Sequence, residues 1–277
     1  MGIVIKGTGM YVPDRILTNA DLEKMVETSD EWITTRTGIK ERHIADREIA
    51  TSDLACEAAK RALEMAGVEP GELDLITVAT VTPDKMFPNT AALVQRKLGA
   101  GNCPCFDLEA ACSGLLYSLE VAHSILSAKK NYKKALVIGA EKLSSIVDWT
   151  DRSTCVLFGD GAAALVLERD DSVGQDFYVA GKLAADGNYG DILHLPAGGS
   201  AMPASHESVD GKCHFIKMGG QETFKLAVTG MTNASKQVLA EAGVAPEQVS
   251  WVIPHQANHR IISAVAQRLA VPEDRVY

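Results

Sequence analysis

Apolar residues along the chain occur in two alternating patterns. Continuous apolar runs, typical of strands buried on both faces of a sheet, occupy residues 3–5, 75–81, 135–139 and 162–167. Between the runs, apolar residues at helical spacing predict a helix over 19–26, which begins after Thr18, and a longer helix over 52–66. We expect Thr51 or Ser52 to cap the longer helix and Gly67 to end it. This alternation predicts an α/β protein.

An internal repeat indicates how the protein is organised. Residues 59–79, AKRALEMAGVEPGELDLITVA, align without a gap with residues 235–255, SKQVLAEAGVAPEQVSWVIPH. In both copies a helix ends at a glycine, Gly67 or Gly243, and a proline and an apolar strand follow. Two segments seldom match over so many aligned positions by chance. We therefore interpret the match as a duplicated α/β unit. We therefore expect two halves, 1–170 and 171–277.

The segment DLEAACSGLLYSL places Cys112 at a turn between a strand and a helix. Residues 105–108 are typical of the end of a short buried strand, and Leu115, Leu116 and Leu119 follow at helical spacing. The first turn of a helix presents free N–H groups and a partial positive charge, which favour a thiolate. The alternative is a small cysteine buried in the core, the commoner fate of a free cysteine.

His255 occupies the equivalent position in the second copy of the repeat. It aligns with Ala79, follows the predicted strand 251–254 and precedes a helix that begins near Asn258. Ligands of parallel sheets gather at the carboxyl ends of strands, so we expect Cys112 and His255 to meet near the pseudo-twofold axis. A structural or helix-capping histidine is the alternative, and the partner cysteine favours catalysis.

Composition excludes several classes of protein. The chain has 277 residues, is 46% hydrophobic and carries a formal charge of -9, which argues against a nucleic-acid binder. No apolar run approaches the roughly 20 residues that span a bilayer, and the first residues do not form a secretory signal. Cys103 and Cys105 lack a matching cysteine pair, which argues against a zinc site. We expect a reduced cytoplasmic enzyme with a long surface loop or flap over 187–211.

Several longer motifs resemble those of one family, the β-ketoacyl-acyl-carrier-protein synthases III of the thiolase-like fold. They are GTGMYVP near the start, TSDEWITTRTGIKERHIA over 28–45, AACSGLLYSL around Cys112, VIGAEKLS from Val137, DRSTCVLFGDGAAALVL from Asp151, and PHQANHRII from Pro254. The resemblance covers essentially the whole chain, and PHQAN separates it from elongating synthases with a PHGTGT-like segment. It implies an α/β fold with layered α-β-α-β-α architecture and duplicated halves.

The resemblance also implies an activity, the first condensation of type II fatty-acid synthesis. Cys112 would take an acyl group from acetyl-CoA or another short acyl-CoA as a thioester. His255 would then donate a hydrogen bond to the thioester carbonyl of malonyl-acyl-carrier protein while carbon dioxide leaves. The enolate-like carbanion would attack the acyl-enzyme and give a 3-oxoacyl-carrier protein. No metal and no organic cofactor is expected.

The same resemblance implies binding residues and partners. Trp32, Arg36 and Arg152 would hold the coenzyme A nucleotide, Asn258 would contact the pantetheine arm, and Phe87 would wall the partner's acyl pocket in a homodimer. Without the family, these side chains would be interpreted as core aromatics or solvated charges. Docking of the acidic carrier protein is expected at Gln256, Ala257, Asn258, His259, Arg260, Lys225 and Arg268.

Two other classes of function stay open. One is a related thiolase-fold enzyme, such as a starter synthase of secondary metabolism or a 3-hydroxy-3-methylglutaryl-CoA synthase. The other is a non-catalytic module that binds acyl-CoA or carrier protein, or a redox-sensing thiol protein. The residues do not determine the preferred acyl chain.

The repeat also leads to an expectation about the second half. Leu98 aligns with Leu269 and Phe106 with Tyr277, so the counterparts of the Cys112 turn and the following strands are expected to need about 50 further residues. The resemblance places a third catalytic residue, an asparagine, and a glycine-rich oxyanion loop in that segment. We therefore expect the 277-residue chain to be an incomplete synthase that folds poorly and at best acylates Cys112.

Overall fold

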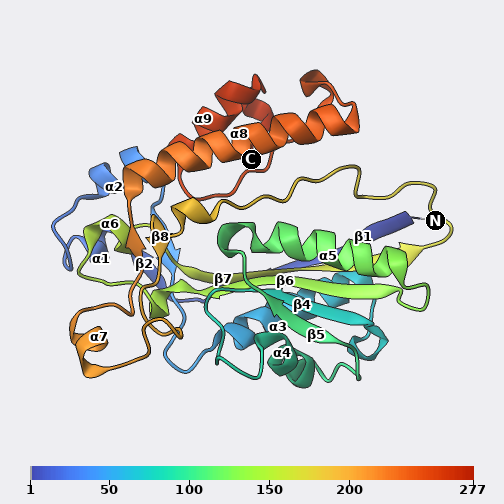
Figure 1. Ribbon diagram of the computed structural model, residues 1–277, viewed down its shortest axis with the longest axis horizontal. Coiled ribbons are helices and arrows are strands. Elements are labelled where there is room, and N and C mark those ends of the chain that lie inside the picture. Colours follow the sequence, from blue (N-terminus) through green and yellow to red (C-terminus); the bar gives the residue numbers. More distant parts are fainter. Residues whose placement is uncertain (1) are drawn as a thin grey trace. The chain divides into compact units, whose positions relative to one another are not determined.

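The computed structural model describes residues 2–277 and divides into two compact units (Figure 1). The first unit comprises residues up to Ile16, His43–Ser145 and Gly159–Gly181; the second comprises Leu17–Arg42, Ile146–Phe158 and Lys182–Tyr277. Each of these spatial units is assembled from three segments of the chain. The predicted halves 1–170 and 171–277 are a different division: each is one continuous stretch, defined by the sequence repeat. Among the helices of the described chain, none is long and apolar enough to cross a bilayer.

The first unit is built on a mixed five-stranded sheet. Its order is β1-β7-β6-β4-β5. β4 runs parallel to both neighbours, β5 and β6, whereas β7 runs antiparallel to both β6 and β1. All five residues of β4 are buried, as the apolar run at 75–81 predicts. The strands are β1 Gly2–Tyr11, β4 Leu75–Ala79, β5 Cys105–Leu108, β6 Lys134–Lys142 and β7 Asp160–Asp170.

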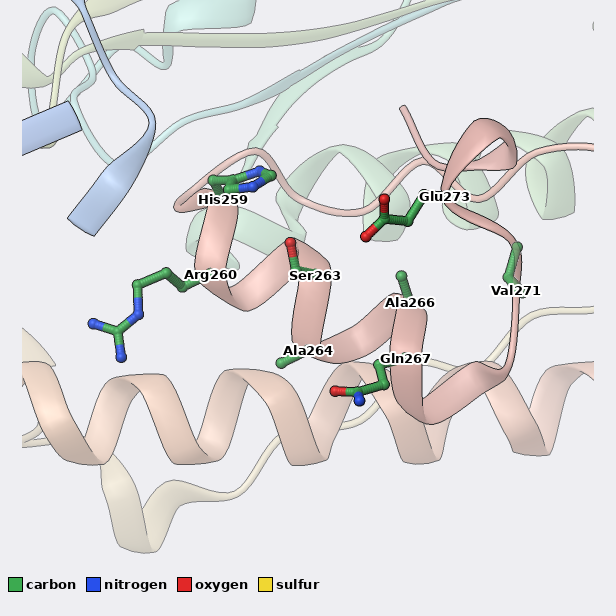
Figure 2. A pocket seen from close by; sticks show the side chains of 8 residues that line it. All are labelled: His259, Arg260, Ser263, Ala264, Ala266, Gln267, Val271 and Glu273. Carbon is green, nitrogen blue, oxygen red and sulfur yellow. The ribbon is translucent and has the colours of Figure 1, made fainter. Parts of the chain in front are cut away.

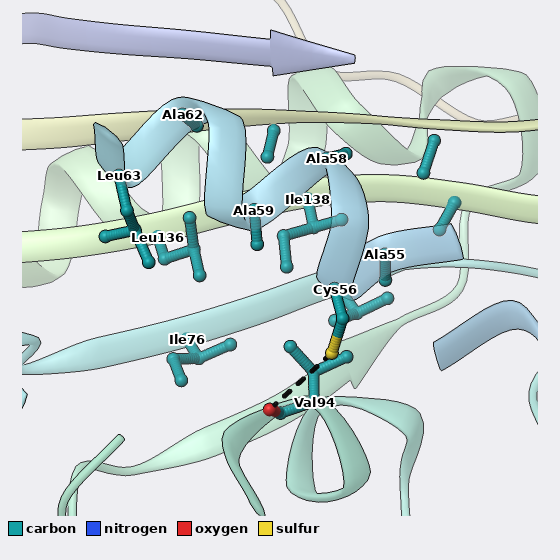
Figure 3. Packing of buried hydrophobic residues seen from close by; sticks show 14 of the residues in the cluster. Ala55, Cys56, Ala58, Ala59, Ala62, Leu63, Ile76, Val94, Leu136 and Ile138 are labelled. Carbon is teal, nitrogen blue, oxygen red and sulfur yellow. Dashed lines mark hydrogen bonds between the residues drawn. The ribbon is translucent and has the colours of Figure 1, made fainter. Parts of the chain in front are cut away.

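Helices cover both faces of this sheet. α3 Thr51–Ala66 and α4 Thr90–Leu98 pack on one face and α5 Gly114–Ala128 on the other (Figure 1). The face of α3 that meets the sheet is rich in alanine (Figure 3), which lets the helix lie close to the strands. At Gly9 of β1, a Cβ atom would lie 2.3 Å from the carbonyl oxygen of Ala58, so this approach requires glycine.

The predicted caps of the two helices have different outcomes. Thr18 caps α1 Asn19–Leu22 as predicted, with its hydroxyl accepting from the Asp21 N–H at 3.2 Å, although the helix ends at Leu22 instead of Val26. The prediction that Thr51 or Ser52 caps α3 is wrong. The cap is Ala50, whose N–H donates to the Asp53 carboxylate at 2.9 Å. The Thr51 and Ser52 hydroxyls instead bond to the Thr82 carbonyl and the Asp84 carboxylate at 2.5 and 2.6 Å.

The second unit is mostly helical. Its two longest helices, α8 Gly220–Ala242 and α9 His259–Leu269, pack around Val228, Ile261 and Val265. The predicted long loop over 187–211 is more regular than expected, because it contains a 3-10 turn Gly187–Tyr189, strand β8 and helix α7. The shorter elements are α2 Asp30–Thr37, α6 Arg152–Cys155, α7 His206–Asp210 and the paired strands β8 Leu193–His194 and β9 Lys217–Met218. β2 Ile16–Thr18 pairs with β3 Glu41–His43.

The sequence repeat is also a structural repeat. In the first copy Ile76 pairs in parallel with Cys105, and in the second copy the aligned residues Val252 and Val276 form a parallel bridge. The C-cap glycines Gly67 and Gly243 both have φ 64°. The predicted strand 251–254 is nevertheless reduced to this single bridge. β4 has a neighbour on each side, whereas the 251–254 segment pairs on one side only within residues 2–277.

Candidate active site

Cys112 lies in a tight turn between a strand and a helix, as predicted. β5 ends at Leu108, a 3-10 turn covers Ala111–Ser113, and α5 begins at Gly114. Ala111 has φ 44°, a left-handed conformation that is strained for a residue with a side chain. A Cβ at Gly114 would lie 3.0 Å from the Cβ of Ala79, so α5 begins hard against the end of β4. Cys112 is therefore held at the carboxyl edge of the parallel strands.

Burial and a nearby carboxylate act on the thiol of Cys112. The residue is exposed, which excludes the alternative of a core cysteine. Partial burial nonetheless raises the pKa of its thiol; the Glu141 carboxylate raises it further, and the backbone N–H of Cys112 opposes them. Lost hydration is the largest of these effects, so the pKa of the thiol lies above its ordinary value. Stabilisation of a thiolate by the helix N-terminus stays a prediction.

Glu141 is a feature of this site that the sequence reasoning missed. It is the penultimate residue of β6 and accepts hydrogen bonds from the Val81 N–H at 2.8 Å and from the hydroxyls of Thr82 and Thr80 at 2.5 and 3.3 Å. Burial raises the pKa of the Glu141 carboxyl, and these hydrogen bonds oppose the rise. The carboxylate thus holds the turn that follows β4. The signal in the sequence was a glutamate two residues after the apolar run at 135–139.

His255 belongs to the second unit, between the bridge at Val252 and the start of α9. His255 has solvent-exposed surface, but the surrounding protein removes part of the hydration of the imidazole and so lowers its pKa. The neutral ring, which offers one N–H donor and one acceptor, is therefore the form at pH 7. Cys112 belongs to the first unit, so the expected meeting of the two side chains stays a prediction.

Three of the predicted nucleotide-binding residues lie together within the second unit. The guanidinium carbons of Arg36 and Arg152 lie 4.9 and 4.8 Å from the centroid of the Trp32 ring. Trp32 and Arg36 are on α2, and Arg152 begins α6 and donates to the Glu27 carbonyl at 2.8 Å. Trp32 is half-buried and both arginines are exposed. An indole flanked by guanidinium groups suits a purine ring and its phosphates.

Asn258 and its neighbours lie at the start of α9. The Asn258 side chain is the N-cap of the helix and accepts from the Arg260 N–H at 2.9 Å. Gln256 donates to the carbonyls of Pro254 and Tyr277, both at 3.0 Å, and Ala257 is half-buried. Gln256 and Ala257 thus lie in the short link between His255 and the helix, and Gln256 ties that link to Tyr277.

The other predicted docking residues, His259, Arg260, Lys225 and Arg268, lie on α8 and α9. The Arg260 side chain extends from the first turn of α9 (Figure 2), with its guanidinium 5.6 Å from the Phe224 ring centroid. His259 and Arg260 line an open groove along α9 (Figure 2). Lys225 is exposed on α8, and Arg268 donates to the Thr229 hydroxyl at 3.5 Å. These positions supply exposed basic groups within one unit.

Phe87 lies in the loop between β4 and α4 of the first unit. Its side chain is 81% exposed, so the alternative of a core aromatic is wrong. The adjacent Met86 is also exposed, at 77%. Two large apolar side chains in solvent form a surface that another protein surface can cover.

Acidic, cysteine and histidine side chains do not gather into groups of three or more that could hold a metal ion anywhere in the described chain.

Comparison with solved structures defines the class of protein. The chain superposes with a TM-score of 0.88 on 3-oxoacyl-[acyl-carrier-protein] synthase III from Aquifex aeolicus VF5, at 50% identity, covering 100% of this chain and 83% of the other. It also matches the priming β-ketosynthase of the R1128 polyketide pathway, with a TM-score of 0.87, 33% identity and coverage of 99% and 80%. The fold is therefore thiolase-like, and the protein is an acyltransferase of the condensing type.

Sequence comparisons identify the family. Residues 106–187 match the model of 3-oxoacyl-[acyl-carrier-protein (ACP)] synthase III, and residues 239–277 match that of its C-terminal part. β-Ketoacyl-[acyl-carrier-protein] synthase III of Caldanaerobacter subterraneus subsp. tengcongensis is 56% identical over 274 residues, which are 99% of this chain and 82% of the relative. The chain belongs to the β-ketoacyl-[acyl-carrier-protein] synthase III family, the initiating condensing enzymes of fatty-acid biosynthesis.

Proposed function

We propose that the protein condenses a short acyl group from acyl-CoA, such as acetyl-CoA, with malonyl-acyl-carrier protein. The observation that carries this proposal is the exposed Cys112 in the strained turn between β5 and α5. A nucleophile has to be accessible and precisely held, and this turn provides both conditions.

In the first half-reaction, the Cys112 sulfur attacks the thioester carbonyl of acyl-CoA after losing its proton. The tetrahedral oxyanion accepts a hydrogen bond from the Cys112 N–H. Coenzyme A then leaves as a thiol and takes up the proton, so that the acyl group is held as a thioester. Because the pKa of Cys112 is raised, ionisation of the thiol is part of the barrier to this step.

In the second half-reaction, malonyl-acyl-carrier protein replaces acyl-CoA. Its carboxylate leaves as carbon dioxide, and the electron pair of the broken bond forms an enolate-like carbanion. The neutral His255 imidazole donates its N–H to the thioester oxygen where negative charge develops. The carbanion attacks the acyl-Cys112 carbonyl, and the Cys112 sulfur leaves. The product is a 3-oxoacyl-carrier protein.

The binding residues can be assigned to the substrates of the two half-reactions. The group formed by Trp32, Arg36 and Arg152 holds the nucleotide of acyl-CoA, and Asn258 contacts the pantetheine arm. Exposed basic side chains of α8 and α9, above all Arg260, dock the acidic carrier protein. The exposed Phe87 walls the acyl pocket of a second copy in a homodimer. We place the enzyme in the cytoplasm, where its six cysteines stay reduced.

The test is intact-protein mass spectrometry after exposure to a panel of acyl-CoAs. We expect stoichiometric acylation by short chains in the unaltered protein and none in the Cys112→Ala variant, which keeps its fold because the exposed turn accepts alanine. Cys213→Ala, at a half-buried thiol of the second unit, is the control and should acylate normally. Label retained in Cys112→Ala would identify a different nucleophile, and no label in any protein would favour a binding module.

A starter synthase of secondary metabolism is the second candidate. The structural match to the R1128 priming ketosynthase supports it, since that relative is 33% identical. The same panel separates the two functions. Preference for acetyl-CoA supports fatty-acid initiation, whereas preference for a longer or branched acyl group supports the alternative.

A further inference from the structure

Arg42 is a buried cation that takes no part in the chemistry described above. It is 3% exposed, and across residues 2–277 no carboxylate forms an ion pair with it. Its Nε and Nη2 both donate to the Val156 carbonyl, at 3.0 and 2.5 Å, and its Nη1 donates to the Asn19 side-chain oxygen at 2.5 Å. Burial lowers the pKa of this guanidinium, so a buried charge is maintained here at a cost in free energy.

Asn19 extends this contact to α2. It is 2% exposed, and its side-chain N–H₂ group donates to the Asp30 carboxylate at 2.7 Å and to the Thr34 hydroxyl at 3.3 Å. A third contact reaches the Ile39 carbonyl at 3.0 Å. Asp30 and Thr34 belong to α2, the helix that carries Trp32 and Arg36. Asn19 therefore holds both ends of the α2 segment.

The other end of the contact is α6. Val156, whose carbonyl accepts two hydrogen bonds from Arg42, is the C-cap of the helix that begins with Arg152. Arg42 and Asn19 thus join the helix of Trp32 to the helix of Arg152 inside the second unit. The planar guanidinium fixes the directions of the hydrogen bonds to Val156 and to Asn19 relative to each other. A lysine ammonium on a flexible stem does not.

We propose that Arg42 and Asn19 are positioning residues for the nucleotide site, which set the spacing of α2 and α6 so that Arg152 lies over Trp32. The proposal rests on the proposed function, because it takes the Trp32 group as the site for the coenzyme A nucleotide. Both residues are buried, so we expect them to act through the two helices and not by touching the ligand. Their effect is specific to the nucleotide end of the substrate.

The test is isothermal titration of the full chain with coenzyme A, together with acylation by acetyl-pantetheine, which lacks the nucleotide. We expect Arg42→Lys to raise the Kd for coenzyme A about tenfold or more and to change the acylation rate from acetyl-pantetheine less than about twofold, with an unchanged circular dichroism spectrum. Combining Arg42→Lys with Arg152→Ala should cost little beyond Arg152→Ala alone, because both act on one site.

Arg169→Lys is the matched control. Arg169 is also buried, at 8% exposure, and also donates to backbone carbonyls, those of Leu126, Lys129 and Lys130, but it lies in the first unit. It should leave the affinity for coenzyme A unchanged. If Arg42→Lys does not fold, Asn19→Asp carries the test, since it keeps an acceptor for Arg42 and loses the donor to Asp30.

The outcomes distinguish this inference from the proposed function. Equal effects of Arg42→Lys on coenzyme A and acetyl-pantetheine, or no effect on either, would overturn the positioning role while acylation of Cys112 stands. If Trp32→Ala leaves the affinity for coenzyme A unchanged, the nucleotide site is elsewhere and both proposals about it fail.

Discussion

Gly38 and His259 approach so closely that a Cβ at position 38 would lie 2.9 Å from the Cβ of His259. Gly38 is the C-cap of α2, with φ 80°, and His259 is the first residue of α9. Glycine is required twice here, for the left-handed backbone and for the contact. The helix of Trp32 and the helix that follows His255 are thereby packed end to end.

We expect Gly38→Ala to destabilise the protein and to weaken binding of coenzyme A. The left-handed backbone costs an alanine about 1 kcal/mol, and the contact with His259 forces α2 and α9 apart. Gly243→Ala is the control, because Gly243 has φ 64° and open space around its Cβ position. Chemical denaturation and titration with coenzyme A measure both effects. Equal losses in the two variants would show that the His259 contact has no role.

Glu141→Gln should move the acylation of Cys112 to lower pH. The pKa of the Cys112 thiol is raised by partial burial first and by the Glu141 charge second, so removing that charge lowers it. The thiolate fraction at neutral pH then rises, and we expect acylation roughly two- to tenfold faster at pH 7. Rates measured by mass spectrometry from pH 6 to 10 test this. Glu109→Gln changes an exposed residue between β5 and the Cys112 turn, and it should leave the pH profile unchanged. A matching shift in that variant would refute the assignment to Glu141.

Asp148→Asn should destabilise the second unit in a pH-dependent way. Burial raises the pKa of Asp148, but hydrogen bonds from Thr150 and the Lys212 ammonium outweigh it and lower the pKa from 3.8 to about 2. The stabilisation from the carboxylate is therefore present above about pH 4 and is lost as the pH falls toward 2. We expect a loss of about 2 kcal/mol at pH 7 by urea denaturation. A loss that stays constant down to pH 3 would contradict this ionic origin.

Arg260→Glu should raise the KM for malonyl-acyl-carrier protein and spare acylation by acetyl-CoA. The exposed guanidinium lies beside Phe224 on the surface of α8 and α9, where charge steers an acidic partner. The effect should weaken with added salt. Arg47→Glu makes the same charge change at an exposed residue of the first unit and should have little effect. Equal damage to both half-reactions would place Arg260 in the coenzyme A site instead.

Phe87→Asp should abolish self-association. Phe87 is 81% exposed, and burial of such a ring against a second copy removes apolar surface from water, which a carboxylate opposes. Sedimentation velocity measures the mass of each variant. Val179→Asp, at an apolar residue that is 74% exposed, is the control. Unaltered mass in Phe87→Asp, or dissociation of both variants, would remove Phe87 from the interface.

The order of residues along the chain was sufficient to predict the local features of this protein. Cys112 was predicted in a turn between strand and helix because small residues and the helical spacing of leucines follow one another directly. The repeat was sufficient to align Ile76 with Val252, because both copies use the same helix, glycine and strand, and the structure then showed that the aligned segments pair in the same way. The Thr18 cap follows from contacts three residues apart.

Tertiary structure decided the features that depend on residues far apart in the chain. Ser52 could not cap α3, because its hydroxyl bonds to Asp84. The pKa of the Cys112 thiol is raised chiefly by burial and further by the charge of Glu141, which a different strand supplies. The sequence around Arg42 does not indicate its hydrogen-bond partners, because one of them, Val156, is 114 residues away. Local patterns determine which elements form, whereas hydration, charge and hydrogen-bond partners are set by whichever distant residues the fold brings into contact.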